Sequence, residues 1–179
     1  MKGFQKIAAA AVVAGSLALG AYGNSQVPQT NLENKVRHEL LMLPYVNVFE
    51  NLTYSVNDGV VTLSGQVTQP VTSRTAESVV KHIPGVTAVN NQIEVLPLSS
   101  FDDRIRLATL NAIYRYAPLQ RYGMGTQPSI RILVKNGNVT LAGVVRTETD
   151  RNLAFVRANG VAGTFSVKNE LQVEDTHVR

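Results

Sequence analysis

The chain contains no cysteine, and this absence restricts both its stabilisation and its chemistry. No disulfide can cross-link the fold, and no thiol can act as a catalytic nucleophile. The lipid-modified cysteine of a bacterial lipoprotein is excluded for the same reason. Charged residues are also sparse, at 17% of 179 residues, whereas hydrophobic residues reach 44%. This composition excludes a disordered chain and is typical of a folded globular protein.

The sequence also lacks the short motifs that mark many catalytic and nucleotide-binding sites. No G-x-S-x-G, H-E-x-x-H, Walker A or G-x-G-x-x-G pattern occurs. His38, His82 and His177 lie far apart without metal-ligand spacing, which favours structural or solvent-exposed roles. Asp102 and Asp103 would point in different directions on a helix, so they suit a helix start better than catalysis. We therefore predict no enzymatic activity, no metal and no cofactor.

The first residues are typical of a bacterial secretory signal. Lys2 and Lys6 precede or flank an apolar run over residues 7–19, and Ala-Tyr-Gly at residues 21–23 supplies a small-x-small cleavage site. The run is shorter than the about 20 residues needed to span a bilayer. We predict export to the periplasm, with a signal peptide removed before Asn24. An uncleaved N-terminal anchor is the alternative.

One stretch of the sequence occurs twice in similar form. Residues 58–67, DGVVTLSGQV, and residues 136–145, NGNVTLAGVV, lie 78 positions apart, and the offset holds without a gap over residues 52–95 of the first copy. The positions identical in both stretches are Gly59/Gly137, Val61/Val139, Thr62/Thr140, Leu63/Leu141, Gly65/Gly143 and Val67/Val145. The chain therefore carries two copies of one module.

Each repeated stretch belongs to a predicted β-hairpin. Apolar and polar residues alternate over residues 52–56, which is the period of a half-buried strand. Asp-Gly at residues 58–59 and Asn-Gly at 136–137 are strong signals for a type I′ turn, whose central residues need positive φ. Gly65 and Gly143 close the returning strands, where a side chain would obstruct a bend or a packed neighbour.

A helix and a third strand follow each hairpin. In the first copy Pro70 suits the first turn of a helix, and Ala76 and Val80 fall on one of its faces. In the second copy Thr147 and Asp150 resemble a capping box. The glycines that stop these helices and the asparagines that align in the third strands are Gly85, Gly163, Asn91 and Asn169.

A further helix opens each copy, with candidate capping boxes at Thr30–Glu33 and Ser100–Asp103. The second copy has an insertion near residues 116–128, YAPLQRYGMGTQP, before its first strand. Each copy thus has the order helix, strand, strand, helix, strand. We predict an α+β fold of two tandem modules, each with a three-stranded mixed sheet covered on one face by two helices.

This order of elements and two motifs resemble the BON domain, named for bacterial osmotic-stress and nodulation proteins. The motifs D/N-G-x-V-T-L-x-G-x-V and G-V-x-x-V-x-N-x-I/L-x-V occur in both copies, except that Thr164-Phe165 replaces the usual valine after Gly163. The resemblance implies an exported envelope protein. Tandem BON proteins are known as periplasmic osmotic-stress proteins and as outer-membrane lipoproteins that bind anionic phospholipid. Without a lipobox cysteine, this chain resembles the periplasmic type.

The resemblance covers nearly all of the chain after the leader. The motif residues have structural roles in turns, strands and helix ends, so they identify a fold and not a site. The predicted divisions are a signal peptide at 1–23, a linker at 24–30, a first module at 31–98, a second module at 99–175 and a tail at 176–179.

Positive charge is concentrated in the second module. Residues 24–98 carry four Lys or Arg against six Asp or Glu (4 − 6 = −2), whereas residues 99–179 carry eleven against seven (11 − 7 = +4). This asymmetry indicates an anionic partner. We predict that arginines meet lipid phosphates while two apolar loop residues dip into the bilayer interface. The candidate lipid-binding residues are Arg104, Arg115, Leu119, Arg121, Tyr122 and Arg131.

Two alternatives remain. In the first, the insertion packs against the first module and its arginines are solvated. In the second, exposed apolar surface or a strand edge holds other envelope proteins, as in a periplasmic stress chaperone or interaction module. Nucleic acid is not expected as a partner, because the chain is predicted to be exported and no recognition motif is present.

Overall fold

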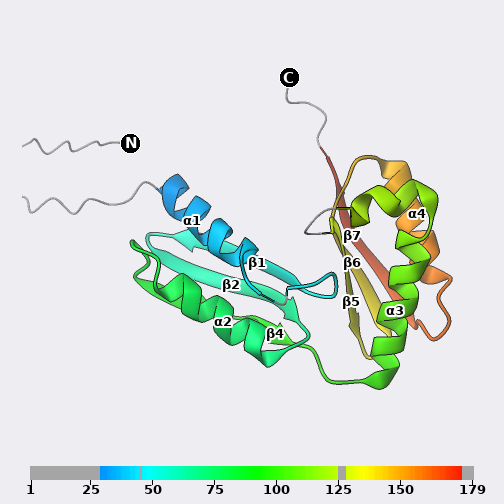
Figure 1. Cartoon of the computed structure of the whole chain (residues 1–179), viewed down its shortest axis with the longest axis horizontal. Coiled ribbons are helices and arrows are strands. Elements are labelled where there is room, and N and C mark those ends of the chain that lie inside the picture. Colours follow the sequence, from blue (N-terminus) through cyan, green and yellow to red (C-terminus); the bar gives the residue numbers. More distant parts are fainter. Residues whose placement is uncertain (1–28, 45, 125–127, 175–179) are drawn as a thin grey trace, which may run out of the picture.

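The computed structural model describes residues 29–44, 46–124 and 128–174. The predicted signal peptide and C-terminal tail lie outside these residues. The described chain folds into two modules, each built from two main helices and one mixed sheet (Figure 1). The predicted α+β fold of two tandem modules is therefore confirmed.

The first module has β2 as its central strand. Its elements are α1 (Gln29–Leu41), β1 (Asn51–Asn57), β2 (Val60–Val67), α2 (Pro70–Lys81), β3 (Ala88–Asn91) and β4 (Glu94–Val95). Strand β1 pairs antiparallel with β2, while β3 and β4 both pair parallel with it. Helices α1 and α2 pack on each other and on the sheet in one apolar cluster that includes Val36, Leu63 and Val80. Helix α1 begins one residue before the predicted cap, Thr30.

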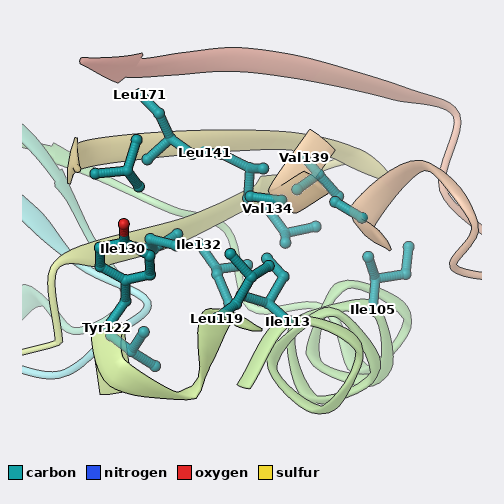
Figure 2. Close-up of a cluster of buried hydrophobic side chains, with 14 residues drawn as sticks. Ile105, Ile113, Leu119, Tyr122, Ile130, Ile132, Val134, Val139, Leu141 and Leu171 are labelled. Atoms are coloured by element: carbon teal, nitrogen blue, oxygen red, sulfur yellow. The ribbon is translucent and has the colours of Figure 1, made fainter. Parts of the chain in front are cut away.

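The second module repeats this plan and adds one short helix. Its elements are α3 (Ser100–Tyr114), the 3-10 helix η1 (Ala117–Gly123), β5 (Ile130–Lys135), β6 (Asn138–Val145), α4 (Glu148–Asn159) and β7 (Ser166–Val173). Strand β6 pairs antiparallel with β5 and parallel with β7. Ile105, Ile132 and Leu141 lie in the apolar core between the sheet and its helices (Figure 2).

The two hairpin turns have the backbone that the sequence predicts. The central φ angles are 49° and 80° at residues 58–59 and 51° and 77° at residues 136–137, as a type I′ turn requires. Gly65 and Gly143 also have positive φ. A Cβ atom on Gly65 would lie 2.0 Å from the carbonyl oxygen of Asn51, and one on Gly143 would lie 1.9 Å from that of Ser129. Glycine is required at these two positions by both conformation and space.

The third strands are tied to the helices by the two aligned asparagines. Asn91 accepts the N–H two residues ahead (3.1 Å) and donates to the hydroxyl of Ser73 in α2 (3.1 Å). Asn169 accepts the N–H two residues ahead (3.3 Å) and donates to the carbonyl of Arg151 in α4 (3.0 Å). In the first module the ladder breaks after Asn91, giving β3 and β4 where one strand was predicted.

Of the two helix caps predicted in the second module, one is confirmed and the other lies one residue earlier than predicted. Thr147 caps α4 as predicted and accepts the N–H of Asp150 (3.1 Å). Helix α3 is capped by Ser99 rather than Ser100. Ser99 keeps an extended backbone, with φ at −152°, and its hydroxyl accepts the N–H of Asp102 (3.1 Å).

The loop between α1 and β1 joins the two modules. The carbonyl of Val48 accepts the N–H of Ile132 in β5 (2.9 Å), and the Val48 side chain belongs to the apolar core of the second module. Arg131 donates to the carbonyl of Asn47 (3.1 Å), and Lys135 forms an ion pair with Glu94. The first module therefore covers the outer side of β5, and the two modules are packed together.

Candidate functional site

The insertion of the second module is part of its core. Leu119 is fully buried and Tyr122 is 5% exposed, and both pack beside Ile113 and Ile130 (Figure 2). The prediction that these two side chains enter a bilayer is therefore wrong. A small domain has few apolar residues with which to fill its core, and η1 supplies two of them at the end of the sheet.

Arg121 lies in the same insertion, and its side chain contacts Asp150 of α4 and the ring of Tyr122. Its guanidinium donates to Asp150 (2.5 Å) and stacks over the ring of Tyr122, 5.1 Å from the ring centroid. Asp150 also accepts from the hydroxyls of Tyr122 (2.8 Å) and Thr147 (2.7 Å). Burial raises the pKa of Asp150, but these three donors outweigh it and hold the pKa below its usual value. Arg121 thus stabilises the fold of the insertion.

Arg131 lies at the junction between the modules. It is half-buried, donates to Asn47 and lines a pocket of about 240 Å³ together with Glu50 and Tyr54. Burial lowers the pKa of Arg131, and the nearby charges of Tyr114 and Glu50 partly offset this. Its position fits a role in holding the modules together rather than in meeting a lipid surface.

Arg104 and Arg115 remain exposed, and they share one side of α3. Eleven positions on an α-helix correspond to about 20° around its axis. The buried residue Ile113 lies on the opposite side, whereas buried Ile105 lies about a quarter turn from the arginines. Leu107, which is 54% exposed, lies between the two arginines along the helix axis and about 60–80° from them around it. We call this surface, formed by Arg104, Leu107 and Arg115, the α3 outer face.

An aromatic pair adjoins the N-terminal end of the α3 outer face. The rings of Phe101 and Phe165 lie 5.9 Å apart, and Arg104 lies 5.8 Å above the Phe101 ring. Phe165 is 74% exposed, and Leu98, three residues before Phe101 in the sequence, is 96% exposed. We call Phe101, Phe165 and Leu98 the aromatic tip. Phe165 packs over Gly137, where a Cβ atom would lie 2.5 Å from the ring.

The aromatic tip was not predicted from the sequence, although the sequence contains one indication of it. Phe165 stands in the segment where the second copy departs from the family pattern after Gly163. The tip requires the start of α3, the β5–β6 turn and the loop before β7 to meet at one end of the module. In Figure 1 this end is the lower end of the second module, where α3 begins.

A pocket of about 480 Å³ adjoins the other end of the α3 outer face. It lies between α3, η1 and the loop that joins the modules. Its lining is mainly apolar, with Arg115, Asn111 and Gln120 as the polar members. The principal apolar residues that line it are Val48, Leu110, Tyr114, Met124 and Pro128.

The described part of the chain contains no cluster of three or more His, Asp or Glu side chains that could hold a metal ion. Among the same residues, no helix is long and apolar enough to cross a membrane. The side chains of the three buried acids, Glu50, Asp102 and Asp150, all accept hydrogen bonds from other groups of the described chain. Their contacts are those of structural groups at turns and helix ends.

Comparison with known families decides the classification. The model of the BON domain matches residues 28–97 and 119–175. The chain belongs to the BON domain family. Its two matches correspond to the two modules, so it is a tandem BON protein. BON domains are associated with binding and with envelope or stress functions, and they are generally non-catalytic.

Comparison with solved structures finds distant similarities. Two are structures of CdsD, a structural protein of the type III secretion system of Chlamydia trachomatis. One is 12% identical and covers 81% of this chain and 94% of its own, and the other, the C-terminal domain, is 15% identical and covers 83% and 100%. Both have a TM-score of 0.30, which is too low to support a conclusion about this BON protein. No curated protein matches the chain.

Proposed function

We propose that this BON protein binds anionic phospholipid through the α3 outer face and the aromatic tip, without catalysis. The observation that carries the proposal is the position of Arg104 and Arg115 on one exposed side of α3, with exposed Leu107 between them. The aromatic tip adds apolar surface beside Arg104. Cationic and apolar groups on one surface complement the phosphates and acyl chains of a lipid interface.

The expected binding is weak and reversible. Each basic residue near an anionic leaflet contributes about 1 kcal/mol, so two arginines favour an anionic over a neutral surface by about 30-fold. Shallow insertion of Leu107 and Phe165 adds attraction that does not depend on headgroup charge. Salt screens the electrostatic attraction of the arginines and leaves the apolar contribution of Leu107 and Phe165.

We place this binding in the bacterial periplasm, in envelope maintenance or the response to osmotic stress. The support is the signal peptide predicted from residues 1–23 together with the family's association with envelope and stress functions. A periplasmic protein without a lipid anchor would reach a membrane surface only through such reversible contacts.

Vesicle co-sedimentation tests the proposal. The protein is mixed with phosphatidylglycerol or phosphatidylcholine vesicles at low and high salt. We expect binding to phosphatidylglycerol alone, lost at high salt and in the double variant Arg104→Glu/Arg115→Glu. The matched control is Arg146→Glu/Lys168→Glu, which changes the net charge equally at exposed positions outside the α3 outer face. Equal loss in both double variants, or equal binding to both lipids, would contradict the proposal.

A second candidate function is the binding of apolar protein segments. The observation that favours it is the high exposure of Phe165 and Leu98, at 74% and 96%. Client binding of this kind would persist at high salt and in the arginine variants. It would fall in Phe165→Ser, measured as suppression of client aggregation.

A further inference from the structure

The 480 Å³ pocket beside Arg115 has the size of a small-molecule site. Ligand pockets in proteins occupy about 300–1,000 Å³, a range that excludes the 240 Å³ pocket at the module junction. Both modules build it: Val48 comes from the loop of the first module, and Leu110 and Tyr114 come from α3. Its shape therefore depends on the packing of the modules.

The interior of the pocket is apolar. Val48, Leu110, Met124 and Pro128 contribute aliphatic surface. Tyr114 contributes its ring, because its hydroxyl donates to the carbonyl of Ile130 (2.6 Å). Contact of such an apolar groove with alkyl groups is favourable, whereas contact with polar groups that find no hydrogen-bond partner there is unfavourable.

One side of the pocket carries a single charge. Among the described lining residues, Arg115 is the one charged side chain, and Asn111 and Gln120 are neutral. Arg115 is also exposed on the α3 outer face. A ligand that fits this arrangement has an alkyl chain for the interior and one anionic group for the guanidinium.

We propose that this pocket holds one alkyl chain of an anionic amphiphile, with Arg115 paired to the anionic group. The ligand is an acyl chain of an anionic phospholipid in a membrane or a free single-chain amphiphile such as a fatty acid. The inference rests on the proposed function, because the α3 outer face brings lipid to the pocket. It adds that the chain lies in an open apolar groove of the protein rather than only against its flat surface.

Titration of the full chain with alkyl phosphates tests the pocket without a membrane. Hexyl, octyl and decyl phosphate are added below their micelle-forming concentrations, and binding is followed by calorimetry. We expect the affinity to rise by up to about fourfold per methylene until the pocket is full. Decanol, which lacks the anionic group, is expected to bind at least tenfold more weakly than decyl phosphate. Affinity independent of chain length would overturn the proposal.

Two matched variants separate the pocket from a general effect of the added charge. Met124 is 78% exposed and lines the pocket, whereas Met42 is 67% exposed and does not line it. Met124→Asp is expected to weaken decyl phosphate binding at least tenfold, whereas Met42→Asp leaves it unchanged. Unchanged binding of decyl phosphate by Met124→Asp would overturn the proposal. Circular dichroism establishes that both exposed substitutions leave the fold intact.

Phosphatidylglycerol vesicles then distinguish the two sources of the chain. If Met124→Asp also weakens vesicle binding, the chain comes from a membrane phospholipid. If Met124→Asp binds vesicles normally but loses decyl phosphate, the ligand is a free amphiphile. Chain-dependent binding of decyl phosphate without any vesicle binding would support the pocket and contradict the proposed function. These experiments can therefore contradict one proposal without contradicting the other.

Discussion

The hydroxyl of Tyr122 and the carboxylate of Glu50 occupy equivalent places in the two modules. Glu50 accepts the backbone N–H of Thr68 (3.0 Å), and Tyr122 accepts that of Arg146 (2.8 Å), which lies 78 residues further along the chain. Both acceptors are buried. At the end of its second strand, the second module thus has a phenol from its insertion where the first module has a carboxylate. This role explains why Tyr122 lies inside the module.

Replacement of this phenol is expected to destabilise the protein. Tyr122→Phe removes the acceptor for the Arg146 N–H and one donor to buried Asp150, so the free energy of unfolding should fall by about 1–3 kcal/mol. Urea denaturation measures the change. The control is Tyr116→Phe, because Tyr116 contacts Arg157 through its ring, which this substitution keeps. Equal destabilisation by both substitutions would contradict the role given to Tyr122.

Tyr114 is expected to make stability sensitive to alkaline pH. Burial raises the pKa of Tyr114 from 10.0 to about 12, although the positive charge of Arg131 acts in the opposite direction. Since the folded-state pKa is the higher one, this contribution is fully present below pH 10 and is lost as pH rises towards 12. The loss is on the order of 2 kcal/mol.

Thermal denaturation between pH 9 and pH 12 measures this dependence. Tyr114→Phe is expected to lower stability at neutral pH through loss of the hydrogen bond to Ile130, but to flatten the decline above pH 10. A decline of the same steepness in the variant would show that other groups cause it. Tyr116→Phe again serves as the control.

The contact between the modules is expected to depend on Val48. Val48→Asp would place a carboxylate in the apolar core of the second module, which strongly disfavours docking of the loop. The Ile132 N–H, which donates to the Val48 carbonyl, should then exchange with solvent at least tenfold faster. Met42→Asp, at an exposed position near the end of α1, should leave this exchange unchanged. Unaltered protection of Ile132 in Val48→Asp would contradict the docking role.

The sequence by itself determined the elements of each module. Asp58-Gly59 and Asn136-Gly137 restrict their own backbone to positive φ, so the turns follow from local conformational preference. The repeat at an offset of 78 residues then places the same elements in both halves. Thr147 likewise caps α4 through a hydrogen bond to a residue three positions away. Such contacts span few residues and are visible as short patterns.

Only the tertiary structure decided which residues of the second module face outwards. Leu119 and Tyr122 have the composition of a membrane-active loop, but core packing with Ile130 and the Arg146 N–H places them inside. Arg121 and Arg104 look alike in the sequence, yet Asp150 holds the guanidinium of Arg121, whereas Arg104 lies over the ring of Phe101. These outcomes depend on partners up to 29 residues away along the chain, brought near by the sheet and the helices. Short patterns therefore could not distinguish a surface residue from a core residue here.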